Sequence, residues 1–600
     1  MASASNEMAS VSTNLPAMGS SIFSSQPPSS TPSAILAVPD AQLPSYITPF
    51  RETLDPGILS FLHWRGALSV PQGAFRESLL RAYICYVHPS LPLLDLGEFL
   101  SAIEDDGKSR TVSLTLFQAV MFAGSTFVDI DVLEREGFKS HEQARRMFYS
   151  KVRTLYDADL ETDSLTLIQI LVLMTYWYDK IEDPKRRSHW MRIALSFVTD
   201  LGLIHHSSLI ALPAAQQQLR RRIWWCCLMR DQLISFSERQ PPSTPWNESD
   251  FPVLLIDDLD VEGLSKALDR LQVLDCKRQS QILMQFCFQK IKLSILIARI
   301  LHTQYEWTSH RSIASLRSKL FLLPKSSSSA SAEYMSRDQE LREWGDDTCT
   351  ALHQSVDIDP SRNSTLVAVH SAVLEMVYSN VLGLVHRPQT LSVHPEDSAA
   401  KALQTFSHQT LRRAAMRISE IAEYLNSADL LRFLPPIGLT ALLFAGLQLV
   451  KDSRSASLSS VHGTTNQNIE QIMQAMIRLK EMYPQAHYAV SVLELVRNKN
   501  LDLEGDESLA IASEQVNANN AQTEPEQIAA PEQLNSSEKP AVITGSSWGG
   551  IDYSRAKGVD FESLLNLDDV SDIFVSGGFG IADFEQVDWS EIFQERNWDA

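Results

Sequence analysis

Six cysteines give this chain the number of thiolates that hold two zinc ions in a cluster. Such a cluster needs ligands close in sequence, usually in C-x2-C pairs, so that one loop can surround each ion. No two cysteines here have that spacing, and the adjacent pair would diverge by about 100° on a helix. We therefore predict no metal site and interpret all six as free thiols that pack in the core. The cysteines are Cys85, Cys226, Cys227, Cys276, Cys287 and Cys349.

A second pattern with catalytic potential is Gly545-Ser546-Ser547-Trp548-Gly549, which matches the G-x-S-x-G motif of a nucleophilic serine. That motif works when a strand delivers the serine to the start of a helix and a histidine supplies the base. Here the preceding segment is polar and no histidine follows, so we favour a Gly/Ser turn. His205 and His206 have no partner at metal-site spacing, and no phosphate-binding glycine loop is present. The sequence predicts no catalytic residue and no cofactor.

Two basic clusters are candidates for contact with nucleic acid, Lys185-Arg186-Arg187 and Arg220-Arg221-Arg222. Each lies at the edge of a strongly apolar helical segment, which favours a solvated helix end whose long side chains cover apolar surface. A nuclear-import role for the first cluster is the alternative. A DNA-binding surface would need more concentrated positive charge than either cluster supplies.

The acidity of the chain is concentrated at its C-terminal end. The formal net charge is -21, yet residues 501–600 alone contain 21 acidic and four basic side chains. The other 500 residues are close to neutral. An acidic segment repels DNA phosphates, so these residues are expected to contact proteins and not DNA.

Composition and apolar spacing divide the chain into four parts and predict an all-α fold, a large multi-helix regulatory domain between disordered ends. Helical periodicity fills the second part, with a cap at Asp163-Ser164, a stop at Pro184 and a flexible loop at 322–334. The apolar run 434–450 is shorter than a membrane span, so we read it as a core helix. The parts are a Ser/Pro-rich leader (1–50), a helical domain (51–500), a polar linker (501–558) and an acidic-hydrophobic segment (559–600).

The last 42 residues contain 11 carboxylates and one arginine, interleaved with large apolar side chains. Charge repulsion keeps such a segment open, and apolar triplets spaced i, i+3, i+4 give it helical faces that can enter a groove on a coactivator. This pattern is typical of an activation segment; packing on the core as a terminal helix is the alternative. The expected anchors are Phe561, Leu564, Leu565, Ile573, Phe574, Phe584, Trp589, Ile592, Phe593 and Trp598.

Four segments together resemble the fungal-specific transcription factor domain, the middle homology region of fungal regulators. They read LLRAYICYVHPSLPLLDLGEFL, SLTLIQILVLMTYW, HWMRIALSFVTDLGLIHH and RRRIWWCCLMRDQLISFSERQPPSTPWNESDFPVLLIDDLD. The last resembles the family's Arg-(Leu/Ile)-Trp-Trp helix, Arg-Asp pair, proline-ended turn and acidic close. Its Trp-Trp-Cys-Cys and Asp-Asp-Leu-Asp are most similar to the cutinase transcription factor branch. The family-motif residues, for which the resemblance implies a structural role, are Trp224, Trp225, Arg230, Asp231 and Arg239.

The resemblance implies a nuclear transcriptional regulator, expected to be an activator of a metabolic or secondary-metabolite gene cluster and not an enzyme. Family members usually carry a six-cysteine zinc cluster before this domain, whereas the first cysteine here is Cys85. Direct DNA contact and contact through a partner regulator therefore both stay open, as does a scaffold that never touches DNA. Further expected partners are a coactivator, a small-molecule effector and a second subunit, identical or different, and no membrane.

Overall fold

The fold begins earlier than the composition indicates. The computed structural model describes residues 43–50, 54–177, 185–244, 251–311, 318–325, 330–355, 365–390, 398–455 and 459–498. Tyr46 and Ile47 are buried, and the ring of Tyr46 lies 5.6 Å from that of Phe117. The leader expected at 1–50 therefore overlaps the domain, because these apolar side chains complete the core. The linker and acidic segment lie outside the described residues.

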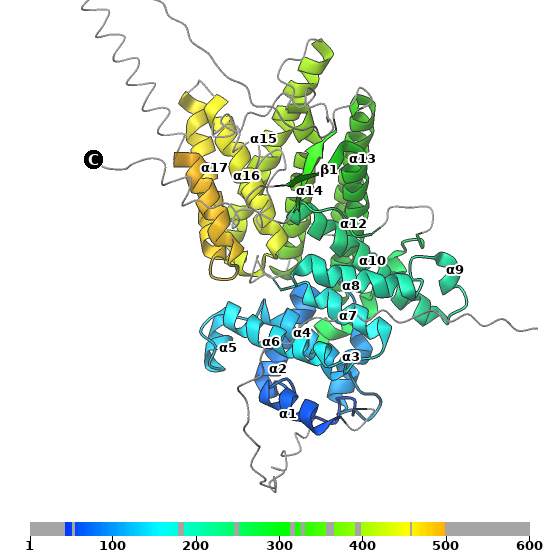
Figure 1. Ribbon diagram of the computed structural model, residues 1–600. Coiled ribbons are helices and arrows are strands. Elements are labelled where there is room, and N and C mark those ends of the chain that lie inside the picture. The colour runs from blue at the N-terminus through cyan, green and yellow to red at the C-terminus, as the bar shows by residue number, and fades with distance from the viewer. Residues whose placement is uncertain are drawn as a thin grey trace, which may run out of the picture. The chain divides into compact units, whose positions relative to one another are not determined.

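The first helices pack around α4 (Leu114–Ser125), every residue of which is buried. The side chain of Ser113 caps its start, and α4 contacts α2, α6 and α7. These helices occupy the lower part of Figure 1. Their bounds are α1 (Pro56–Trp64), α2 (Gly73–Ala82), the π-helical η1 (Tyr83–Val87), α3 (Leu96–Glu104), α5 (Ile130–Arg135) and α6 (His141–Asp157).

The central helices include α7 (Ser164–Met174), which starts at the predicted cap: the backbone N–H of Thr166 donates to Asp163 at 2.8 Å. It ends well before Pro184, because the guanidinium of Arg230 donates a hydrogen bond to the carbonyl oxygen of Thr175 at 3.0 Å. Residues 178–184 lie outside the described ranges. The other helices of this part of the chain are α8 (Arg187–Asp200), α9 (His206–Leu209), α10 (Ala214–Glu238), the 3-10 turn η3 (Ile256–Asp258) and α11 (Val261–Arg270).

Long helices form the C-terminal half and run side by side in the upper part of Figure 1. Pro436 opens α16 as predicted, since proline suits the first helical position. A final helix spans residues 485–498. The bounds are α12 (Cys276–Gln304), α13 (Ala330–Ser355), α14 (Thr365–Thr390), α15 (Ser398–Ser427), the 3-10 turn η4 (Leu431–Phe433), α16 (Pro436–Ser455) and α17 (Ser459–Leu479).

The described residues contain a single antiparallel pair of strands, β1 (Tyr305–Arg311) and β2 (Ser318–Pro324). The prediction of a loop at 322–334 is therefore wrong at both ends. Strand β2 extends to Pro324, and α13 begins at Ala330. Both α12 and α14 are long and apolar enough to cross a membrane by composition, but most of each apolar window is buried in the fold. They are core helices, and the all-α fold class is confirmed.

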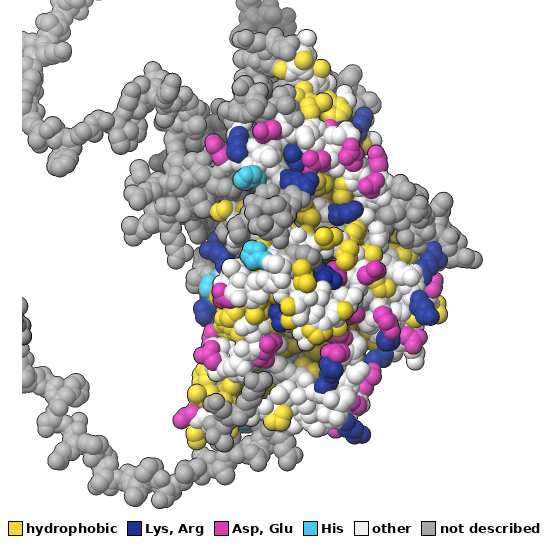
Figure 2. Space-filling model, turned by 90° about the vertical axis from the view of Figure 1, so that its right-hand side faces the viewer, with side chains coloured by type: hydrophobic (Ala, Val, Ile, Leu, Met, Phe, Trp, Pro, Cys, Tyr) yellow, Lys and Arg dark blue, Asp and Glu magenta, His cyan; other side chains and the backbone are white. Residues whose placement is uncertain are grey.

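Side chains of both charges are interspersed on the face shown in Figure 2. Lys and Arg lie among Asp and Glu across this face, with apolar side chains between them. A phosphate-binding surface instead gathers positive charge on one face. This side of the described domain does not have that character.

Candidate functional site

The family-motif segment forms α10, and its aromatic and sulfur side chains are buried. Trp224, Trp225, Cys226 and Cys227 are all below a tenth exposed, and both indole rings contact Phe251 edge-on. Burial raises the pKa of both thiols well above the ordinary range. They are core residues and not reactive thiolates.

The other cysteines divide between core and surface. Cys85 and Cys287 are buried, whereas Cys276 is half-buried at the start of α12, which departs from the core position expected for it. The burial of Cys349 is outside what the structure describes. Among the described residues, no three His, Cys, Asp or Glu side chains converge as metal ligands would.

The polar motif residues of α10 hold neighbouring segments. Arg230 donates to the hydroxyl of Thr175 at 2.8 Å and lies over the ring of Tyr176. Asp231 is buried and accepts the backbone N–H groups of residues 243 and 244 at 3.0 and 2.9 Å. Burial raises the pKa of this carboxyl, and those hydrogen bonds oppose the rise. Arg239 ends the helix with a left-handed backbone at φ 52°.

Two of the three arginines that open this motif are structural, which corrects the expectation of a solvated helix end. Arg221 binds Asp258 through two hydrogen bonds of 2.8 and 2.6 Å, and the carboxylate is buried. Arg222 is buried and donates to the carbonyls of Leu94 and Asp258. Since Asp258 belongs to the acidic close and Leu94 to the first motif, α10 brings distant motif segments together. Arg220 is partly exposed and makes no hydrogen bond or ion pair with the described residues.

The basic cluster at 185–187 is also tied to the fold. Arg187 pairs with the buried carboxylate of Glu238 at 2.7 Å, and Lys185 lies 3.7 Å from Asp157. This ion pair ties the start of α8 to the end of α10. Neither basic cluster is free to form a phosphate-binding patch.

A buried lysine of α12 and a buried histidine of α14 contact the first motif, which itself contains the buried His88. Lys290 donates to Ser90 at 3.1 Å, and His370 contacts the same hydroxyl and the carbonyl of Cys85. Burial lowers the pKa of His88 to about 3 and that of His370 to about 4, and it also lowers the pKa of Lys290. The chemistry of this cluster is structural, because its hydrogen bonds join η1, α12 and α14.

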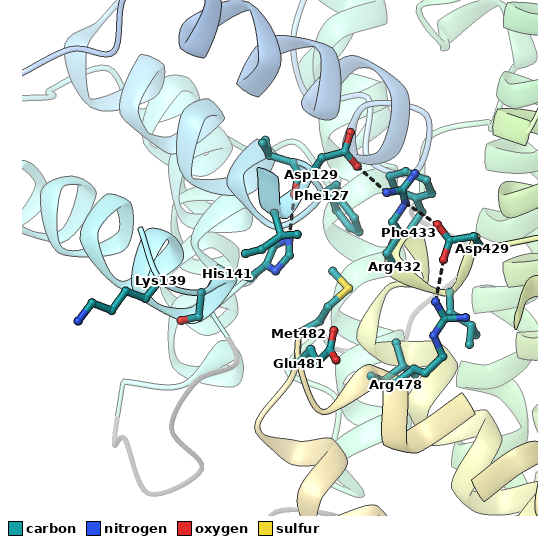
Figure 3. A pocket seen from close by; sticks show the side chains of 15 residues that line it. Phe127, Asp129, Lys139, His141, Asp429, Arg432, Phe433, Arg478, Glu481 and Met482 are labelled. Atoms are coloured by element: carbon teal, nitrogen blue, oxygen red, sulfur yellow. Dashed lines mark hydrogen bonds and ion pairs between the residues drawn. The ribbon is translucent and has the colours of Figure 1, made fainter. Parts of the chain in front are cut away.

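A pocket of about 450 Å³ lies where the N-terminal helices meet the C-terminal ones, and we call it the junction pocket. Residues 127–141, from the end of α4 to the start of α6, form one side, and residues 429–482 form the other (Figure 3). Its volume falls in the range of small-molecule sites. The lining residues are Phe127, Val128, Asp129, Ile130, Lys139, Ser140, His141, Asp429, Leu431, Arg432, Phe433, Arg478, Leu479, Glu481 and Met482.

A chain of ion pairs crosses this pocket between its two sides. Arg432 pairs with Asp129 at 2.8 Å and lies 3.9 Å from Asp429, which in turn pairs with Arg478 at 2.7 Å (Figure 3). The neighbouring ring of Phe433 stacks on Tyr86 at 4.1 Å. Contacts from segments about 300 residues apart therefore build the site.

Comparison with known proteins places the motif helices in a family. Residues 80–340 match the family described as fungal specific transcription factor domain. Residues 80–340 of this chain belong to this family. Its members are transcription factors and not enzymes, as the sequence predicted. The matched residues run from α2 into α13, so they hold one side of the junction pocket but not the side formed by 429–482.

Curated relatives extend the similarity into the C-terminal helices. The chain is 33% identical over 474 residues to cutinase transcription factor 1 beta of Fusarium vanettenii, covering 76% of this chain and 53% of that protein. Transcription factor cpaR of Aspergillus oryzae is 29% identical, over 67% of this chain and 68% of its own length. The acetamidase regulatory protein of Aspergillus fumigatus is 24% identical, over 64% and 43%. The chain spans about half the length of the first two relatives that it matches, at 53% and 51%.

Sequence reasoning selected α10 but missed two features that the fold assembles. The sequence did contain an indication of the Arg221–Asp258 pair, since a basic cluster and an acidic close belong to one motif. It contained no indication of the junction pocket, because the residues of that pocket come together only through packing. All ten expected anchors of the acidic segment lie outside the described residues.

Proposed function

We propose that this protein is a nuclear transcriptional activator that recruits a coactivator through residues 559–600. The observation that carries the proposal is the fungal transcription factor domain at 80–340, followed in the same chain by a segment of 11 carboxylates and one arginine. In this arrangement the helical domain supplies regulation and assembly, and the acidic segment supplies recruitment.

The genes under control are proposed to serve metabolism, as a pathway or a secondary-metabolite cluster. The names of these relatives support this, since they refer to cutinase and to acetamidase. A small-molecule effector and a second subunit belong to the same proposal. The junction pocket supports the effector, because it joins the matched domain to helices beyond it.

A co-regulator that does not itself contact DNA is the second candidate, and the ion pairs favour it within the described domain. Arg187, Arg221 and Arg222 serve the fold and not a phosphate backbone. An electrophoretic shift assay with the purified chain at physiological salt separates the two. A shift by this chain alone contradicts the co-regulator, and no shift without a partner regulator supports it.

Fusing residues 501–600 to a heterologous DNA-binding module tests the activation role. We expect reporter output from the fusion and a large loss when Phe561, Leu564, Leu565, Trp589 and Phe593 become alanine. The control is a fusion in which five serines of residues 501–558 become alanine, and its output should be unchanged. A silent fusion refutes the activation role.

A further inference from the structure

The junction pocket has apolar walls and a polar edge, and its two parts call for different ligand chemistry. Phe127, Leu431, Leu479 and Met482 are all buried side chains that contribute to the walls. Such a wall accepts an aromatic or aliphatic body through removal of apolar surface from water. The polar residues at the edge then decide which head group the ligand carries.

The arginines of the pocket are already neutralised by carboxylates, so they do not select an anion. Arg432 is held by Asp129, and Arg478 is held by Asp429 and by the side-chain oxygen of Asn426 at 2.7 Å. An anionic ligand would have to displace these pairs and meet their carboxylates at close range. Like charges at short distance disfavour that binding mode.

His141 presents a hydrogen-bond acceptor to the pocket. Its Nε2 lies 2.9 Å from the carbonyl oxygen of Val128. Because a carbonyl only accepts, Nε2 carries the proton, and Nδ1 of the neutral ring keeps its lone pair. Burial is the main cause that lowers the pKa of this ring. The hydrogen bond to Val128 and the charge of Glu481 oppose that shift without cancelling it, so the neutral form prevails near pH 7.

Glu481 supplies a negative charge that no described side chain neutralises. It follows α17 in a turn, its side chain is exposed at the pocket edge, and it makes no ion pair or hydrogen bond with the described residues. In Figure 3, His141 faces the pocket from one side, Met482 and Glu481 face it from the other, and Lys139 points away. The unsatisfied groups are thus one carboxylate and one ring nitrogen, both acceptors.

We propose that the junction pocket binds a small amphipathic amine, with the ammonium between Glu481 and His141 and the apolar body against Phe127, Leu431 and Met482. An ammonium group carries one positive charge and three N–H donors. Two of these donors can meet the two acceptors, and the charge is opposite to that of Glu481. The inference rests on the proposed function only in that the amine is the effector of that regulator. A bound amine bridges residues 127–141 and 429–482, and therefore stabilises one arrangement of the two halves of the fold.

The test uses the purified full chain and three indoles that differ in the head group: tryptamine, tryptophol and indole-3-propionate. Isothermal titration measures binding, and thermal unfolding measures the accompanying rise in Tm. We expect tryptamine to bind about tenfold more tightly than the alcohol or the acid, because only its ammonium group can form charge-assisted hydrogen bonds to both acceptors. Equal binding of all three, preference for the acid, or no tryptamine binding at millimolar concentration overturns the proposal.

Two variants locate the amine. Glu481→Gln keeps the size of an exposed side chain and should weaken tryptamine binding about tenfold without changing the Tm of the free protein. Glu494→Gln, an exposed glutamate of the 485–498 helix, is the matched control and should change the affinity less than about twofold. Unchanged affinity in Glu481→Gln contradicts the site. Neither measurement involves transcription, so a silent reporter fusion and a failed titration are separate results.

Discussion

The buried ion pair between Arg221 and Asp258 makes a sharp prediction about α10. Arg221→Met removes the guanidinium and leaves the carboxylate without its cation at a position where Asp258 is only 1% exposed. The neighbouring residues Arg220 and Arg222 allow a comparison on the same helix. Arg220 makes no hydrogen bond or ion pair with the described residues, whereas Arg222 is buried and donates to backbone carbonyls. Three consecutive arginines thus test three different environments on one helix turn.

Breaking a buried ion pair by removal of one partner costs about 3–5 kcal/mol. We expect Arg221→Met to fall in that range, since the two hydrogen bonds of 2.8 and 2.6 Å are both lost. Asp258→Asn should cost less, about 2 kcal/mol, because Arg221 is 12% exposed and can turn toward water. The double change Arg221→Met with Asp258→Leu should cost less than the sum of Arg221→Met and Asp258→Leu, each measured singly.

Guanidinium unfolding of the full chain, followed by tryptophan fluorescence, measures these changes, since Trp224 and Trp225 are buried one turn away. Arg220→Met is the control and should lie within about 0.5 kcal/mol of the native chain. Equal effects of Arg220→Met and Arg221→Met would refute the reasoning. Strict additivity in the double variant would do the same, because it would show that the two side chains do not interact.

Three further predictions concern the packing around the motifs. Asp231→Ala removes the acceptor for two backbone N–H groups, one buried and one partly buried, and should destabilise the chain by about 2–4 kcal/mol, read from the same unfolding curves. His88 and His370 have folded pKa values of about 3 and 4, below their ordinary value of about 6.5, so the unfolded chain binds more protons as the pH falls. Stability is therefore full above about pH 6.5 and falls by about 1.4 kcal/mol per pH unit for each histidine down to about pH 4; His370→Gln should remove one proton from that slope. Gly124→Ala should lower the Tm, because the new Cβ would collide with the carbonyl oxygen of Leu79 on α2, whereas an alanine at Gly463, which has open space, should be tolerated.

The helical fold and several boundaries could be predicted from local patterns. Asp163 and Pro436 mark helix starts through capping and backbone chemistry that act within a few residues. The early end of α7 could not be predicted, because a guanidinium 55 residues further along the chain takes the carbonyl of Thr175. The packing of residues 43–50 on the domain was missed for a similar reason, since Tyr46 is held by its contact with Phe117.

The candidate site was only partly visible in the sequence. The motif around Trp224 identified the family, but its arginines were expected in solvent, because a run of three basic residues is usually exposed and the partner Asp258 lies 37 residues away. The junction pocket depends on the approach of Asp129 and Arg432, whose positions share no local spacing. Contacts of this kind follow from tertiary packing alone.

The central claim is that this chain activates transcription by recruitment through its acidic segment. The most direct measurement tethers the full chain to a promoter through a heterologous DNA-binding module and compares reporter output with that of the variant in which the five anchors are alanine. Those anchors are Phe561, Leu564, Leu565, Trp589 and Phe593. We expect strong output from the native chain and output near that of the DNA-binding module alone from the variant. Equal output from the two chains, at equal protein levels, would contradict the account.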